Sequence, residues 1–272
     1  QMIFFNEQEL PKPALFAELQ KLQTINIRID NAVCYLSGEL CIFALNYGRN
    51  VNKYDAAVLE NMVVQSRFLR SLAAQIMEVE DAFAYMVRAL ARAAEATDED
   101  SGNHVVRIGE YCAVLSERLG LDKEFTAAIK LQATLHDVGK IFTPSAILKK
   151  RENLSREDWL EIKKHPVFGA KIIGAHPRLL LAQSIALNHH ELWDGSGYPR
   201  GLKGNAIPIE ARIANLADQY DTLRIQRTHK PALDHETACR ILNQGDGRTM
   251  PRHFDPQVLR AFRETAFLFE EI

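Results

Sequence analysis

The spacing of hydrophobic positions near the start of the chain is that of short strands. Residues 24–33 alternate apolar and polar side chains, as a half-buried strand does, and a second short apolar run follows at 40–48. Residues 37–39 form a plausible turn between them. These runs predict a β-hairpin, although a helical reading of 31–47 stays open. Residues 13–22 have helical spacing.

From residue 54 to residue 96 the apolar positions recur at helical intervals, and the stretch contains no proline or glycine. Asp55 can cap its start. The pattern predicts one long helix or two nearly continuous helices. A helix of this length joins a sensory module to an output module or forms a dimer seam. A core helix inside a single domain explains the same pattern, and both interpretations stay open.

After residue 98 the chain reads as helices separated by loops, with strand signals nearly absent. Gly120 is a good helix C-cap, and Ser155 with Asp158 three residues on is close to a capping box. The predicted helices cover 103–121, 122–140, 155–166, 176 up to the histidine pair at 189–190, 207–223, 234–244 and 255–272. We therefore expect a mainly α fold with a small N-terminal α or α/β segment and a long connecting helix.

Composition narrows the class of protein. The chain has 272 residues, 47% of them hydrophobic, and a formal charge of -2, so nothing favours DNA, RNA or an anionic membrane as the main partner. No apolar run approaches the roughly 20 residues of a membrane span. The four cysteines are far apart and form no CxxC pair, which is typical of reduced cysteines. We expect a cytoplasmic protein.

The sequence HDVGK places His136 directly before Asp137. Neutral imidazole and ionised carboxylate are ligands that Fe, Mn and Zn prefer. In an adjacent pair the imidazole can bind one metal while the two carboxylate oxygens reach a second. Lys140, three residues later, could contact a phosphate held by those metals. The alternative is a helix end with a solvated aspartate and lysine.

Three further patterns carry candidate ligands. Asp100 and His104 have the i,i+4 spacing of one helix face. Asp218 and Asp221 lie one turn apart on an apolar helix, where a buried unpaired carboxylate is costly unless a cation compensates it. An amphipathic helix with both aspartates at its edge is the competing interpretation. The stretch NHHELWDGSGYPRGLKGNAIP, at 188–208, begins with adjacent histidines.

HDVGK followed about fifty residues later by HHELWDGSGYPRGLKGNAIP resembles the signature of the HD-GYP family of metal-dependent phosphohydrolases. The resemblance covers roughly residues 83–265. It implies a helical bundle with a binuclear or trinuclear metal centre that hydrolyses cyclic di-GMP (c-di-GMP) to pGpG, and in some members on to GMP. We accordingly expect a regulatory segment with the connecting helix over 1–80 and an HD-GYP domain over 81–272.

The resemblance also implies roles for individual residues. The position four before His104 is often glutamate in members with a third metal, and Asp100 stands there, which leaves two metals against three open. Fe or Mn is the expected metal, with Zn or Ni as alternatives. Asp137 is expected to bridge, and Asp137 and Lys140 to act in catalysis. The implied ligands are His104, His136, Asp137, His165, His189, His190, Asp218 and, for a third metal, Asp100.

Substrate phosphates are expected to contact Lys140, Arg227 and Lys230. The family's usual segment after the late aspartates is altered here, since Thr228 and His229 replace a Pro-Tyr pair. A c-di-GMP receptor that binds without cutting, and an HD phosphohydrolase acting on another nucleotide, are therefore alternative functions.

Partners are implied as well. The family's GYP loop, here Gly197, Tyr198 and Pro199, is the expected contact for a diguanylate cyclase (GGDEF) domain, and the long helix is a candidate homodimer seam. Residues 38–90 resemble the C-terminal end of a GAF-type sensory domain.

Overall fold

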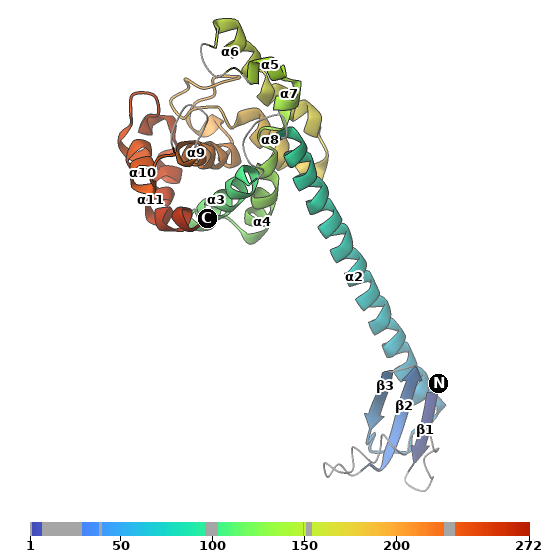
Figure 1. The fold of residues 1–272 in the computed structure, drawn as a ribbon. Coiled ribbons are helices and arrows are strands. Elements are labelled where there is room, and N and C mark those ends of the chain that lie inside the picture. The colour runs from blue at the N-terminus through green and yellow to red at the C-terminus, as the bar shows by residue number, and fades with distance from the viewer. Residues whose placement is uncertain are drawn as a thin grey trace. The chain divides into compact units, whose positions relative to one another are not determined.

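The computed structural model describes residues 2–6, 29–37, 40–95, 103–148, 150, 154–225 and 232–272. The chain divides into two compact units, residues 1–81 and 82–272 (Figure 1). None of the helices in the described ranges is both long enough and apolar enough to cross a membrane. The helix predicted at 13–22 lies outside the described residues.

The first unit contains a three-stranded antiparallel sheet in the order β1 (Met2–Asn6), β2 (Asn31–Ser37), β3 (Leu40–Leu45). A hairpin is confirmed with its predicted second strand, but its first strand is Asn31–Ser37 and not 24–33, and the helical alternative for 31–47 is wrong. Successive side chains of a strand point to opposite faces of the sheet, which explains why a strand forms here. Cys34 packs on one face with Ile3 and Phe5, and Val33 packs on the other face. A helix could not separate these neighbours onto opposite faces.

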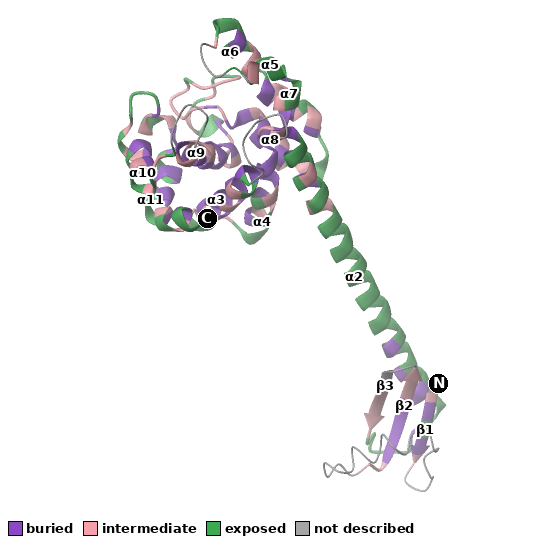
Figure 2. Ribbon diagram, in the orientation of Figure 1, coloured by how far each residue is buried: buried purple, intermediate pink, exposed green. Residues whose placement is uncertain are grey.

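The long apolar pattern forms one helix, α2 (Lys53–Glu95), of 43 residues. Asn52, and not the predicted Asp55, lies just before the first residue of the helix, and its side chain accepts the amide of Tyr54. Asp55 lies inside the first turn, where its carboxylate accepts the amide of Asn52. The first turns bury Leu59 and Val63 against the sheet residues. The middle of the helix is exposed (Figure 2).

The second unit has helices joined by loops and no strand among its described residues, so the mainly α prediction is confirmed. Its α-helices are α3 (His104–Arg118), α4 (Lys123–Gln132), α5 (Ser145–Leu148), α6 (Arg156–Ile162), α7 (His165–Ile173), α8 (Leu180–Asn188), α9 (Ile209–Arg224), α10 (His235–Gln244) and α11 (Pro256–Glu271). Short 3-10 turns are η1 (Ala133–Leu135), η2 (Val138–Phe142), η3 (Pro177–Leu179), η4 (Gly204–Ala206) and η5 (Pro251–His253).

Helices α3, α9 and α11 enclose the main core of this unit. Tyr111 of α3 stacks on Phe269 of α11 with ring centroids 4.5 Å apart, and Tyr220 of α9 meets both rings edge-on. Such aromatic contacts add about 0.5–1.5 kcal/mol each beyond the area they bury. The three helices therefore form a rigid base for the residues at their ends.

The structure differs from the predicted helices in two places: α7 (His165–Ile173) was not predicted, and the helix predicted at 122–140 is divided. The stretch 122–140 is not a single helix, because α4 ends at Gln132 and the chain continues in η1 and η2. His136 and Asp137 lie between these two tight turns. Gly139 explains the change of path, because a Cβ there would stand 2.0 Å from the carbonyl oxygen of His165 and 2.4 Å from the amide nitrogen of Gly169. The backbone of η2 thus lies directly against α7.

Candidate metal centre

The predicted ligands in the described residues come together from the ends of several helices. His104 begins α3 and His165 begins α7. His189 and His190 follow the last residue of α8. Side chains at helix ends can point past the helix, so several helices can present ligands to one volume. Asp218, from the middle of α9, faces the same volume, with Oδ1 3.8 Å from Nε2 of His104.

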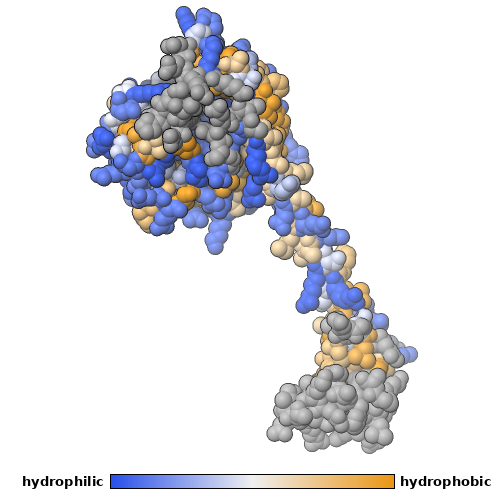
Figure 3. Space-filling model, viewed as in Figure 1, coloured by the Kyte–Doolittle hydropathy of each residue, from blue (hydrophilic) through white to orange (hydrophobic). Residues whose placement is uncertain are grey.

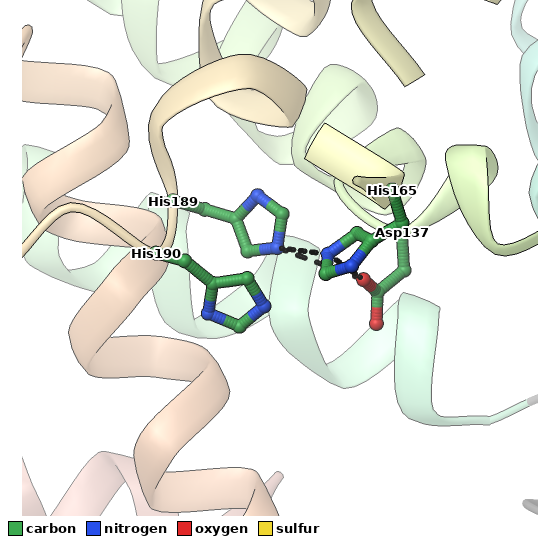
Figure 4. A group of neighbouring side chains, drawn as sticks. All are labelled: Asp137, His165, His189 and His190. Atoms are coloured by element: carbon green, nitrogen blue, oxygen red, sulfur yellow. Dashed lines mark hydrogen bonds and ion pairs between the residues drawn. The ribbon is translucent and has the colours of Figure 1, made fainter. Parts of the chain in front are cut away.

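The donors form two groups that share Asp137. In each group the ligand atoms lie within 4.8 Å of one another. Figure 4 draws the first group, in which Oδ1 of Asp137 lies 3.2 Å from Nε2 of His165. The carboxylate of Asp137 therefore faces both sets of imidazoles. The groups are Asp137, His165, His189 and His190, and His104, His136 and Asp137.

Backbone carbonyls orient three of the imidazoles. Because a carbonyl can only accept, the Nδ1–H groups must donate: His136 to Ala133, and His165 to Ile162. His189 likewise donates from Nδ1 to the carbonyl oxygens of Ile185 and Ala186. In the neutral ring this leaves each Nε2 as a lone pair directed into the site. Metal-bound histidines are held in this way by an acceptor behind the ring.

The donor atoms of the site lack other partners. Nε2 of His165 and Nε2 of His189 lie 3.4 Å apart, which brings two lone pairs together. Nε2 of His136 and Oδ1 of Asp137 are buried and make no hydrogen bond to any described residue. Buried polar atoms without partners are costly, and a cation among them would satisfy all four. The residues therefore fit a divalent metal centre.

Electrostatics keep Asp137, His189 and His190 in the forms that bind cations, whereas His136 must lose a proton before it can bind one. Burial raises the pKa of Asp137, but Lys140 and His136 outweigh it and hold the pKa well below its usual range. Burial lowers the pKa of His189 and lowers that of His190 further, so both rings are neutral at pH 7. Burial also acts to lower the pKa of His136, yet Asp137 and Asp218 raise it to about 9.

Lys140, predicted to contact a substrate phosphate, lies beside the shared carboxylate. Its Nζ is 2.7 Å from Oδ2 of Asp137, and this ion pair joins residues three positions apart in the sequence. A lysine at this distance from the shared carboxylate places a positive charge at the edge of the donor cluster.

Asp221 has a role that the sequence alone did not assign. Its buried carboxylate accepts Nδ1 of His104 at 2.6 Å and the Nε of Arg107 at 2.7 Å. Burial raises the pKa of Asp221, but His104 and Arg107 outweigh it and lower the pKa. His104 is thus held by a carboxylate, where His136, His165 and His189 use carbonyls. The signal in the sequence was a second aspartate one turn after Asp218 inside an apolar helix.

Replacing Asp221 by asparagine should weaken metal binding about 10–100-fold, because the acceptor that orients His104 loses its charge. Titration of the chelator-stripped protein with Mn²⁺ measures the effect. Glu110→Gln is the matched control, since Glu110 also forms an ion pair from α3, with Lys130, but on the surface. An Asp221→Asn protein that binds Mn²⁺ as tightly as the control would contradict this role.

The glycine-rich loop is tied to the site through its backbone. The Glu191 carboxylate accepts the amides of Arg200 and Leu202, both at 2.8 Å. Gly197 passes so close to the histidine pair that a Cβ would stand 2.5 Å from the carbonyl oxygen of His190. The half-buried Tyr198 ring stacks on the His190 ring, with centroids 4.7 Å apart. Tyr198 therefore faces the donor cluster, and the predicted GGDEF contact stays a prediction.

The remaining site residues of the prediction lie outside the described residues. They are Asp100, Arg227 and Lys230. Arg224, just before this segment, donates to the carbonyl oxygen of Leu233 at 3.0 Å.

Comparison with known protein families identifies the type of domain that carries this site. Residues 88–258 match the HD domain family. The chain belongs to the HD-domain family. Within that family its long glycine-rich signature is of the HD-GYP type. The HD motif is the His136–Asp137 pair that joins the two donor groups.

Relatives of this HD domain are named as phosphodiesterases. A cyclic di-GMP phosphodiesterase of Vibrio cholerae is 38% identical over 215 residues, covering 74% of this chain and 43% of that protein. A 3'3'-cGAMP-specific phosphodiesterase 2 of the same organism is 38% identical over 182 residues, covering 66% and 34%. The chain thus spans less than half of the length of these two relatives.

A solved structure supports the fold. The crystal structure of a V. cholerae cyclic GMP-AMP specific phosphodiesterase (V-cGAP3) superposes with a TM-score of 0.50 at 18% identity, covering 68% of this chain and 48% of that chain.

Proposed function

We propose that this chain is a metal-dependent phosphodiesterase that hydrolyses c-di-GMP to the linear dinucleotide pGpG. The observation that carries the proposal is the shared position of Asp137 between two groups of histidines. A carboxylate in that position suits a pair of cations, which is the arrangement used by many phosphoester hydrolases. The relatives named as cyclic di-GMP phosphodiesterases supply the substrate class.

The donor set indicates which metals suit the site. Imidazoles with carboxylates, and no cysteine among them, favour Fe or Mn, with Zn or Ni as alternatives. When bound, divalent ions lower the pKa of coordinated water and draw charge from phosphoryl oxygens. His104, His136, Asp137, His165, His189, His190 and Asp218 are the residues proposed to hold them.

The chain's own side chains have further tasks in this proposal. Lys140 offsets negative charge on a phosphate beside Asp137. The Tyr198 ring covers His190 and keeps water from that side of the cluster. Glu191 holds the loop that carries Tyr198 in place through its two backbone hydrogen bonds.

The test is turnover of c-di-GMP by chelator-stripped protein with Mn²⁺, Fe²⁺, Zn²⁺ or Ni²⁺ added separately, with the products separated by chromatography. Appearance of pGpG with one of these metals is the expected result. Tight binding of c-di-GMP without any linear product would instead identify a non-cutting receptor.

A second substrate has a specific observation in its favour. One relative, equal in identity to the first, is named for 3'3'-cGAMP. The assay therefore includes 3'3'-cGAMP at the same concentration, and a higher kcat/KM for it than for c-di-GMP would overturn the choice of substrate while retaining the reaction.

Metal removal should lower thermal stability of the second unit. At a free metal concentration 100 times its Kd, binding stabilises the folded state by about 2.7 kcal/mol, which corresponds to roughly 5–11 °C in Tm for a unit of this size. Differential scanning fluorimetry with and without a chelator measures this. An unchanged Tm would argue against metal binding to the folded cluster.

We also propose that the exposed part of α2 pairs with the same helix of a second copy of the chain. Its apolar positions follow alternating steps of three and four residues, which is the heptad pattern of a coiled coil. Figure 3 shows apolar residues between polar ones along this helix. The seam consists of Val58, Met62, Leu69, Leu72, Ile76 and Val79, with Gln65 as its polar position. It ends before Phe83, which packs against the buried cluster of the second unit.

Replacing Leu72 by lysine in the seam should convert a dimer to a monomer, as measured by light scattering after size exclusion. Met77→Lys is the control, because Met77 is exposed on the same helix but lies off the seam. Equal masses for the two variants would contradict the pairing.

A GGDEF-domain partner at Gly197, Tyr198 and Pro199 is a separate proposal. Because Tyr198 stacks on His190, its substitution would disturb the metal cluster as well. Pull-down of a purified GGDEF domain with a Pro199→Ser variant is therefore the cleaner test, and undiminished capture would contradict the contact.

A further inference from the structure

Three side chains in the described part of the molecule have a buried polar atom without a hydrogen-bond partner. They are His136 at Nε2, Asp137 at Oδ1 and Glu95 at Oε2. The first two belong to the metal cluster. Glu95 is the last residue of the long helix α2, and nothing in the signature motifs refers to it.

The end of α2 lies beside the metal cluster. Ala91 and Ala94 pack in one buried cluster with Val105, Leu135 and Val138. Each of these three residues is the direct chain neighbour of a proposed ligand, namely His104, His136 or Asp137. The last turn of α2 therefore contacts the backbone segments that present the second group of donors.

The charged neighbours of Glu95 are members of the same site. Its carboxyl group interacts electrostatically with His104, His136 and Lys140, which favour the charged form, and with Asp137, which opposes it. Burial is the largest influence and raises the pKa of Glu95.

Whether the Glu95 carboxyl group is charged or protonated, its buried Oε2 atom needs a further group to interact with. A carboxylate at Oε2 needs a donor or a cation, and a protonated acid needs an acceptor, but the described residues provide no hydrogen-bond partner for that atom. A divalent cation on the side of His104 and His136 satisfies the oxygen and balances the charge. Carboxylate oxygens are suitable ligands for Mn and Fe.

We propose that the Glu95 carboxylate is a further ligand of the metal centre, on the side of His104 and His136. This inference rests on the metal centre of the proposed function. It places a ligand on α2, nine residues before His104 and separate from Asp100. The helix that starts at the N-terminal sheet would then end at the catalytic metals, so a displacement of its last turn would alter metal binding directly.

The experiment compares Mn²⁺ binding to the chelator-stripped full chain and to Glu95→Gln, Glu78→Gln and Asp137→Asn variants, by calorimetry and by metal analysis after gel filtration. Glu78→Gln is the matched control, because Glu78 is an exposed glutamate of the same helix. We expect Glu95→Gln to bind one equivalent fewer, or to bind one equivalent at least about tenfold more weakly, with unchanged far-UV circular dichroism.

Two outcomes separate this inference from the proposed function. If Asp137→Asn loses metal while Glu95→Gln matches the Glu78→Gln control within twofold, the inference about Glu95 is wrong and the metal centre stands. If neither variant differs from the unaltered chain, both are wrong. Should Glu95→Gln fail to fold, Glu95→Asp keeps the charge with a shorter side chain, and Mn²⁺ binding equal to that of the unaltered chain would overturn the inference.

Discussion

Replacing Asp137 by asparagine should abolish metal binding and reduce c-di-GMP hydrolysis at least about 10³-fold, a loss of roughly 4 kcal/mol in transition-state stabilisation. Asp137 is the residue shared by the two donor groups, so its substitution affects both. Asparagine keeps the size of the side chain but removes the negative charge that balances Lys140 and the cations. Metal content and turnover, measured on the same preparation, test this.

The fold should survive that substitution. The Asp137 side chain makes its ion pair with Lys140 in the same tight turn, and the core of α3, α9 and α11 does not involve it. Asp194→Asn is the matched control, because Asp194 lies in the glycine-rich loop and pairs with Arg252 on the outside. Activity of Asp194→Asn within about threefold of the unaltered chain, beside an inactive Asp137→Asn, is the expected pair of results. An Asp137→Asn protein with normal turnover would refute the assignment of the centre.

Replacing Gly139 by alanine should have the largest effect on stability. The added methyl group would stand 2.0 Å from the carbonyl oxygen of His165, a backbone atom that cannot rotate away. Either η2 or α7 must move, and His165 moves with α7. We expect a loss of about 3 kcal/mol or more, or roughly 6–12 °C in Tm, together with weaker metal binding.

Thermal unfolding and Mn²⁺ titration of Gly139→Ala measure the two effects. Lys171→Ala is the control, since Lys171 is exposed on the same helix α7 and its substitution leaves the contact intact. A Tm within about 2 °C of the control would mean that the two segments separate easily, and the close approach would not be needed for the site.

Much of the second unit could be predicted from local patterns. Ser155 and Asp158 form the expected capping box, and Gly120 ends its helix with a positive φ of 74°. These features depend on residues three or four apart, so a sequence window contains all the information. The stretch 122–140 was predicted wrongly as one helix because its break depends on the contact between Gly139 and α7, which no local window includes.

The identity of the candidate ligands was also accessible from the chain itself. Adjacent residues such as His136 and Asp137, or His189 and His190, indicate a metal site, since neighbouring side chains can bind neighbouring ions. The sequence showed Asp221 as an aspartate in an apolar helix, but it did not show which residue pairs with it. Arg107 contacts it across 114 positions of sequence.

The sequence by itself therefore determined most helices of the HD domain, several of their caps and the types of donor that line its site. The tertiary structure decided which donors face each other, which carboxylate stands behind His104, and that Glu95 at the end of α2 lies beside the cluster. The physical reason is how far apart in the sequence the interacting residues lie. Helix periodicity and capping arise from neighbours along the chain, whereas convergence of ligands depends on how buried faces of distant helices pack, and Ala94 against Val105, Leu135 and Val138 is such a packing.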